Sequence, residues 1–245
     1  MHSRDTLTLI HPTGELTLSS STLLVAIDDT GNESFPPKER CFGLGGCACL
    51  VRDYGDLIEV PWWKMKEQHF VGWSQPMHAA DLRNPTEDQM QAVGTFSEAN
   101  HFFRFACMAA ESAENDDKIS IITAVGALLM ERVLDMATAA RTTEVTVIFE
   151  ASQRLNKPVL ESLSGRIISD GVTQNPVQVH FLPKLANSAF LEVADFVVHA
   201  AGGQLRRRIA GKHLPTRKDF QSVFWRVPPH LSHHNELLRA RQVDA

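Results

Sequence analysis

The chain has 245 residues, of which 43% are hydrophobic, and it carries a net charge of −5 at neutral pH with a pI near 6.1. This length predicts one large domain, or one domain with a small appendage, and the composition can supply a buried core. No apolar stretch approaches the roughly 20 residues of a membrane span, and the first residues lack the features of a signal peptide, so we expect a cytoplasmic protein. The acidic balance excludes a general attraction to nucleic acid, which would need a local basic patch.

The first part of the chain predicts an arm followed by an antiparallel meander. Residues 1–22 form the arm, with a small hairpin around Pro12-Thr13-Gly14. Apolar and β-branched runs predict three strands, at Leu23–Ile27, Cys41–Val51 and Leu57–Trp63. Consecutive strands joined by short connections pair in an antiparallel sense, which gives the meander.

The rest of the chain predicts alternating helices and strands. In chain order these are a long helix at Thr86–Ala113, Lys118–Ile122 as either a strand or the approach to a helix at Ala124–Ala140, a strand at Val145–Phe149, a helix at Lys157–Ser169, a strand at Val177–Leu182 and a helix at Ser188–Arg207. Such an order predicts an α/β fold, in which a mixed sheet is covered on both faces by helices. We assign this domain to residues 23–208.

Residues 209–245 form a C-terminal extension rich in proline, histidine and basic residues. The cluster His230-Leu-Ser-His233-His234 has ligand atoms for a metal, but its spacing fits no recognised metal site. We therefore favour a solvated tail, with an arm that docks a partner as the alternative.

The cysteines predict structure rather than chemistry. Cys41, Cys47 and Cys49 share parity, so an unbroken strand points them to one face. Their spacing lacks the paired knuckle of a zinc site, and small buried thiols are the favoured interpretation.

Two adjacent carboxylates, Asp28 and Asp29, end the first predicted strand, and Thr30-Gly31-Asn32 predicts the turn after it. Charge at the mouth of a buried strand is costly unless it is compensated, and a divalent cation that takes carboxylate oxygens is a common compensator. Alternatively, one aspartate caps the turn through its own backbone.

Further carboxylates end a second strand and line the last helix. Glu150 follows the strand Val145–Phe149, whereas Glu192, Asp195 and His199 lie at i, i+3 and i+7 of a nearly all-apolar helix. An acidic stripe on a buried helix needs a partner. The partner is either a lysine or arginine elsewhere in the fold, or a metal shared with Asp28 and Glu150.

His78 lies in the loop before the long predicted helix. Its imidazole titrates near neutrality, so it either orients a water or leaving group, or packs against Trp73 while Asp81 or Asn84 caps a short turn.

Several of these motifs, in this order, resemble those of the DUF3800 family: an Asp-Glu-Ser-Gly strand end, a Phe-x-x-Gly-Gly strand, an Ile-Asp strand end and a Leu-Gln-x-Ala-Asp helix. The matching segments are Asp28-Asp29-Thr30-Gly31, Cys41-Phe42-Gly43-Leu44-Gly45-Gly46, Phe149-Glu150 and Leu191-Glu192-Val193-Ala194-Asp195. The resemblance spans about residues 23–202. It implies an RNase H-like fold with an acidic active site that binds Mg²⁺ or Mn²⁺. Asp29, Thr30 and Glu150 keep the functional group of the family residues Glu, Ser and Asp but change how far that group extends from the backbone. Glu192 places a charge where the family has glutamine.

Together these features lead to the hypothesis of a metal-dependent phosphoesterase or nuclease. Asp28, Glu150 and Asp195 would hold one or two Mg²⁺ or Mn²⁺ ions, with Asp29, Glu192 and His78 as second-rank candidates. The alternative is a catalytically weakened binding or regulatory module on the same fold.

A run of arginines supplies the densest positive charge. Arg206, Arg207 and Arg208, with Lys212, Arg217 and Lys218 beyond them, either contact the phosphates of a nucleic acid or complement the dipole of the last helix. By helix rise alone, Arg206 lies about 16 Å from Asp195.

Overall fold

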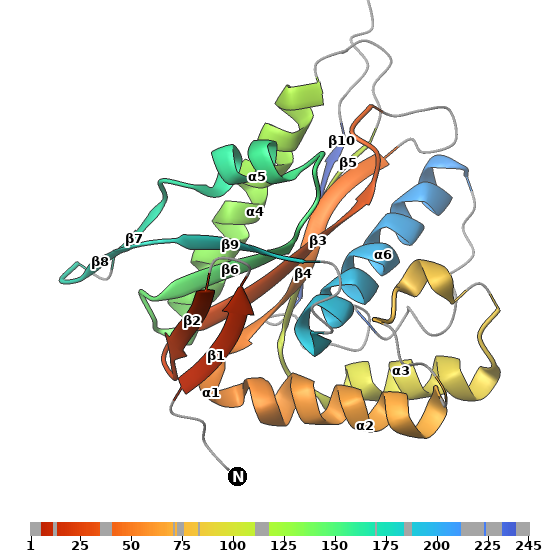
Figure 1. Cartoon of the computed structure of the whole chain (residues 1–245). Coiled ribbons are helices and arrows are strands. Elements are labelled where there is room, and N and C mark those ends of the chain that lie inside the picture. The colour runs from red at the N-terminus through yellow and green to blue at the C-terminus, as the bar shows by residue number, and fades with distance from the viewer. Residues whose placement is uncertain are drawn as a thin grey trace, which may run out of the picture.

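The structure is a computed structural model that describes residues 6–11, 14–34, 41–70, 72, 76–82, 84–110, 118–169, 171–183, 188–211, 223 and 232–238. Within these residues a six-stranded sheet of order β10-β5-β4-β3-β6-β9 forms the centre (Figure 1). No helix in the described ranges combines the length and apolarity needed to cross a membrane.

The central sheet has an antiparallel half and a parallel half. β3 (Leu23–Gly31), β4 (Cys41–Leu50) and β5 (Phe103–Ala110) pair antiparallel in sequence. β6 (Val145–Glu150) and β9 (Gln178–Leu182) continue the sheet parallel to β3. The expected mixed α/β sheet is confirmed at this level.

Helices cover both faces of the sheet (Figure 1). α6 (Ala189–Ile209) packs on one face with Leu24 and Ala26, the even-numbered residues of β3. α4 (Lys118–Ala140) and α5 (Asn156–Leu163) pack on the other face, where the odd-numbered residues of β3 point. The alternation along β3 therefore assigns each of its side chains to one of two hydrophobic clusters.

One predicted strand of the meander, Leu57–Trp63, is wrong. It lies inside a continuous helical segment made of α1 (Val51–Tyr54), a π-helical turn η1 (Gly55–Glu59) and α2 (Val60–His69). The buried residues of the segment have a helical spacing that a strand could not place on one side, and they join the α6 cluster: Tyr54, Ile58, Trp62 and Met65.

The third antiparallel strand comes instead from the second half of the long predicted helix. α3 (Glu87–Ala99) begins as expected, at a capping box between Thr86 and Gln89, but it ends well before Ala113. Arg104 caps this end of the helix, because its guanidinium donates to the carbonyl oxygens of Ser97 and Asn100. The chain is then free to continue as β5.

Other expectations also need adjustment. Lys118–Ile122 belongs to α4, so the helical alternative holds. The helix expected over Lys157–Ser169 ends at Leu163, and after Gly165, which has a positive φ of 76°, the chain forms β7 (Ile167–Ser169), which pairs with β8 (Gln174–Pro176). The left-handed conformation at Gly165 ends the helix at little steric cost.

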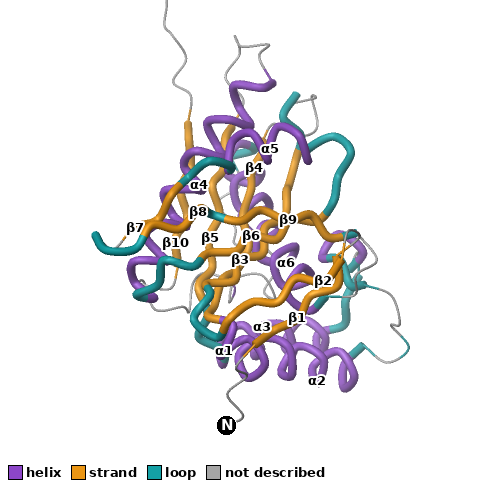
Figure 2. Tube along the Cα trace, turned by 60° about the vertical axis from the view of Figure 1, so that its left-hand side comes forward, coloured by secondary structure: helices purple, strands orange, loops and turns teal. Residues whose placement is uncertain are grey.

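The arm carries the expected hairpin, formed by β1 (Thr6–His11) and β2 (Gly14–Ser19). Leu7 and Leu18 of this hairpin join the hydrophobic cluster that contains Tyr54, and the hairpin lies beside α1 (Figure 2). It is therefore packed against the domain and is not a loose arm.

The C-terminal extension contributes an edge strand. β10 (Ser232–Leu238) pairs parallel with β5, so the preference for a solvated tail is wrong for these residues, which include His233 and His234. Pairing satisfies the backbone groups that the edge of β5 would otherwise leave open. His230, Trp73, Lys212, Arg217 and Lys218 lie outside the described residues.

The three cysteines of β4 are buried together in the cluster beneath α6, as their shared parity predicts. Burial raises the pKa of the Cys49 thiol well above its usual range, so this thiol is held in its neutral, unreactive form.

Candidate acidic site at the ends of β3 and β6

Asp28 and Glu150 lie side by side on two neighbouring parallel strands: Glu150 is the last residue of β6, and Asp28 comes three residues before the end of β3. The turn predicted at Thr30-Gly31 is wrong, because β3 continues through these residues and pairs with β4. The register pairs Ile27 of β3 with Phe149 of β6, so the next residue of each strand is also a neighbour. Ile148 packs in the α6 cluster, and Glu150, two residues later, points to the same face as Asp28. Neighbouring strands lie about 4.8 Å apart, which places the two carboxylates within strong electrostatic range.

Asp195 joins this pair because α6 lies directly on the sheet. A Cβ on Gly46 would overlap the carbonyl oxygen of Ala26 and would lie 3.1 Å from the Cβ of Ala194, so only glycine allows the helix this close. The next helical residue, Asp195, then reaches Asp28, close enough for a hydrogen bond between the two carboxyl groups. Such a bond requires a proton on one of them.

The loop before α3 supplies a further contact from η2 (Ala79–Asp81). The backbone N–H of Ala79 donates to Oδ2 of Asp195 at 2.5 Å. The preceding residue, His78, is half-buried and close enough for its charge to lower the pKa of Asp195. The structure therefore brings together Asp28, Glu150, Asp195 and His78, four of the residues that the sequence singles out.

Burial raises the pKa values of the two aspartates, Asp28 and Asp195. For Asp28, burial raises the pKa well above its usual value, and the charges of Asp195, Asp29 and Glu150 raise it further. Burial is also the main reason that the pKa of Asp195 rises to about 6, although the Ala79 N–H, His78 and the contact with Asp28 oppose the rise. The pair therefore keeps a proton at a pH where isolated aspartates are ionised.

Asp29 points to the opposite face of β3 and has its own cation. Its Oδ2 accepts a hydrogen bond from Nη2 of Arg154 at 2.9 Å, and Arg154 also binds Glu33. Asp29 therefore acts on the site only through its charge. Arg154 lies in the loop between β6 and α5, where no periodic pattern signalled its role.

Glu192 does not join the acidic group. Its Oε1 accepts from Nζ of Lys66 at 2.8 Å, and its Oε2 accepts from Nε1 of Trp62 at 2.6 Å and from Lys66 at 3.0 Å. Both oxygens are thus occupied in a buried ion pair between α6 and α2. The partner of Glu192 is therefore a lysine, Lys66, which was the first of the two alternatives from the sequence. The expectation that Glu192 is a metal ligand is corrected, because the residue has a structural role in this ion pair.

Arg206 approaches the site from the far end of α6. The helix runs along β3 in the same direction, because Ala194 lies on Gly46 and Gly202 would contact the side chain of Thr30 if it carried a Cβ. Asp195, Gly202 and Arg206 therefore share one face of the helix. The Nη1 of Arg206 donates to Oγ1 of Thr30 at 3.4 Å, two residues along the strand from Asp28.

The other arginines of the run are placed less specifically. Arg207 is half-buried and Arg208 is exposed, and both have interactions of their own. Arg206 is the member of the described basic run for which a contact on the face of β3 that carries the acidic group is established.

The donor chemistry of this group suits a hard cation, since it consists of carboxylate oxygens that repel one another. Among the described residues, however, no three histidine, cysteine, aspartate or glutamate side chains stand in an arrangement that already fits a metal ion. Asp195 and Glu150 are partly exposed, so the group is open to an ion from solvent.

Comparisons of the chain with models of protein families, with curated proteins and with solved structures found no match. The resemblance to the DUF3800 family and the RNase H-like fold therefore stay predictions.

Proposed function

We propose that the chain is a divalent-cation-dependent phosphoesterase in which Asp28, Glu150 and Asp195 hold Mg²⁺ or Mn²⁺. The observation that carries the proposal is the contact between the buried carboxyl of Asp28 and that of Asp195, with Glu150 alongside. Three carboxyl groups lie close together, and two of them have raised pKa values. A bound positive charge would relieve their mutual repulsion. A cation would take the place of the shared proton.

The chemistry of the bound ion would be that of a Lewis acid, which lowers the pKa of a bound water and stabilises negative charge on phosphoryl oxygens. The chain's own residues have separate tasks. The N–H of Ala79 fixes the orientation of the Asp195 carboxyl. His78, at the same loop, is placed to accept a proton from a water or to donate one to a leaving oxygen.

Arg206 supports a phosphate as the substrate group. Its contacts within the described residues are neutral and long, at 3.4 Å to Thr30 Oγ1 and 3.9 Å to Cys41 Sγ. A guanidinium with such weak partners can exchange them for the two oxygens of a phosphate, which it binds in a forked geometry. It lies on the face of β3 that also carries Asp28, so one phosphate can contact the arginine while the next reaches the acidic group.

The decisive experiment is a hydrolysis assay. Bis(p-nitrophenyl) phosphate and labelled single-stranded oligonucleotides would be incubated with Mg²⁺, Mn²⁺ or EDTA, using wild type, Asp28→Asn and Asp195→Asn. Asp135→Asn is the matched control, because Asp135 is an exposed aspartate on α4. We expect cation-dependent cleavage by wild type and the control, and a loss of at least 100-fold in the two site variants, since removal of a ligand removes the bound charge.

Two outcomes would contradict the proposal. Cleavage that persists equally in Asp28→Asn and Asp195→Asn comes from a contaminant. Cation binding without cleavage of any phosphoester would favour the alternative, a binding or regulatory module that uses the same acidic site.

A further inference from the structure

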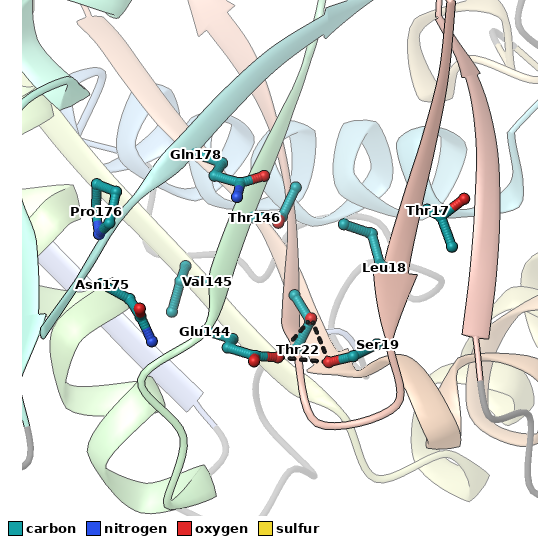
Figure 3. A pocket seen from close by; sticks show the side chains of 10 residues that line it. All are labelled: Thr17, Leu18, Ser19, Thr22, Glu144, Val145, Thr146, Asn175, Pro176 and Gln178. Atoms are coloured by element: carbon teal, nitrogen blue, oxygen red, sulfur yellow. Dashed lines mark hydrogen bonds between the residues drawn. The ribbon is translucent and has the colours of Figure 1, made fainter. Parts of the chain in front are cut away.

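A cavity of about 300 Å³, open to solvent on one side, lies at the opposite end of β6 from the acidic group (Figure 3). Its walls come from β2, the start of β6, β8 and the start of β9. Thr146, which lines it, lies on the same face of β6 as Glu150 but four residues earlier, a separation of about 13 Å along a strand. The cavity is therefore separate from the carboxylate site.

The lining of this cavity is mainly polar. Hydroxyl and carboxamide side chains make up most of the wall, and Leu18, Val145 and Pro176 add apolar surface. Among the described residues of the lining, Glu144 is the one ionisable group, and no lysine or arginine is present. An anionic ligand would meet this charge without a compensating cation, so the cavity disfavours anions.

Three hydroxyl groups contact the carboxylate of Glu144, which is itself exposed at the rim of the cavity. Ser19, Ser21 and Thr22 all donate to Oε2, the last two at 3.0 and 3.2 Å. Oε1 accepts no hydrogen bond from the residues that the structure describes, so its lone pairs are available. The hydrogen bonds from Ser19 and Ser21 lower the pKa of Glu144, which keeps the group ionised at neutral pH.

We propose that this cavity binds a small organic cation, an aliphatic amine or guanidine, whose charged end donates to Oε1 of Glu144. The fixed carboxylate is preorganised, so little ordering is needed when the N–H donor arrives. The methylene groups of the ligand then lie against Leu18, Val145 and Pro176, and the hydroxyl and carboxamide oxygens accept the remaining N–H groups. The volume is at the lower end of the range for ligand pockets, which suits a ligand of a few heavy atoms.

The test compares three four-carbon probes that differ only in charge: butane-1,4-diamine, butane-1,4-diol and succinate. Binding would be measured by calorimetry at constant ionic strength, because screening by salt would otherwise change with the probe. We expect the diamine alone to bind wild type. Comparable binding of the diol would mean a site for neutral polar ligands, and the absence of diamine binding up to about 10 mM, a very weak affinity, would overturn the proposal.

Four variants locate the site. Glu144→Gln keeps the side-chain size, removes the charge and should weaken diamine binding at least tenfold, because a charge-assisted hydrogen bond is lost. Gln178→Arg, which places a cation in the exposed wall, should do the same while Glu144 stays in place. Glu161→Gln, on the exposed side of α5, should leave affinity unchanged. Asp28→Asn should also leave it unchanged.

Two results would show that the diamine does not bind in this cavity. If Glu144→Gln and Gln178→Arg both bound the diamine as tightly as wild type, the diamine would bind elsewhere. A loss of affinity in Asp28→Asn would place the diamine at the acidic group. Far-UV circular dichroism of each variant checks that the fold is kept, and Gln178→Arg decides the matter if Glu144→Gln fails to fold.

Discussion

The carboxyl groups of Asp28 and Asp195 interact directly, in a place where each would repel the other if both were ionised. The contact exists because the two residues meet at the same face of β3, with α6 packed close over Gly46. Structures tolerate such a contact only when a proton or another positive charge mediates it. The stability of the protein should therefore depend on what occupies this point.

The first prediction concerns pH. A carboxyl whose pKa is raised in the folded state contributes stability that is fully present below its unfolded pKa and lost as pH rises through the folded pKa. For Asp195 the window runs from its ordinary 3.8 to about 6. At about 1.4 kcal/mol for each pH unit, the loss is roughly 3 kcal/mol.

Urea unfolding of wild type and Asp195→Asn between pH 4 and pH 8 would measure this loss. An asparagine keeps both hydrogen bonds, because its oxygen accepts from the Ala79 N–H and its amide donates to Asp28. We expect the variant to gain stability relative to wild type as pH rises. A constant difference between the two proteins across this range would show that the pair does not titrate as described.

The second prediction concerns cations. Mn²⁺ should raise the melting temperature of wild type at pH 8, because a ligand that binds only the folded state stabilises it in proportion to the logarithm of its concentration over Kd. Asp28→Asn should be more stable than wild type without Mn²⁺, since a repelling charge is removed, and should gain less from Mn²⁺. Equal gains in the two proteins would exclude Asp28 as a ligand. Asp135→Asn serves again as the control.

The third prediction tests the structural role of Glu192. Lys66→Met should cost about 3–5 kcal/mol, because it leaves a carboxylate buried without its cation. The double variant Lys66→Met/Glu192→Leu should recover most of that loss, although Trp62 Nε1 then lacks its acceptor. Chemical denaturation of the single and double variants gives both values. If Glu192→Gln instead abolished the gain from Mn²⁺ while the fold stayed intact, Glu192 would return to the set of metal ligands.

The fourth prediction concerns Arg206. Arg206→Gln should weaken oligonucleotide binding about tenfold and reduce the salt dependence by about one phosphate contact. Its effect on stability should be small, since the partners of Arg206 are neutral and distant. Fluorescence anisotropy at several salt concentrations measures both quantities, with Arg141→Gln, at the far end of α4, as the comparison. An unchanged salt slope would remove Arg206 from the phosphate-binding surface.

The convergence of the acidic residues could be predicted because its signals are local. Asp28 and Glu150 each follow a β-branched run, and parallel strands bring such ends to one edge of a sheet. The helix of Asp195 is long, apolar and readily recognised. The choice among its acidic residues was not predictable, because the sequence does not show that Lys66 lies opposite Glu192.

The failed expectations have physical causes of the same kind. The segment around Trp62 has no strict alternation, and only its packing against α6 selects helix over strand. The boundary near Asn100 depends on a cap from Arg104, which comes later in the chain. β10 pairs with β5 across more than a hundred residues, a contact that no local pattern encodes. The contact of Ala79 with Asp195 is equally non-local.

This separation along the chain has a kinetic consequence. Ala79 and Asp195, which meet at one hydrogen bond, are 116 residues apart, and the carboxyl groups come from three different elements. The acidic group can therefore form only when β3, β6 and α6 have all assembled, which makes it a late event in folding. Interactions that are absent from the folding transition state change the rate of unfolding rather than the rate of folding. A cation bound there would slow the unfolding of the protein without speeding its folding.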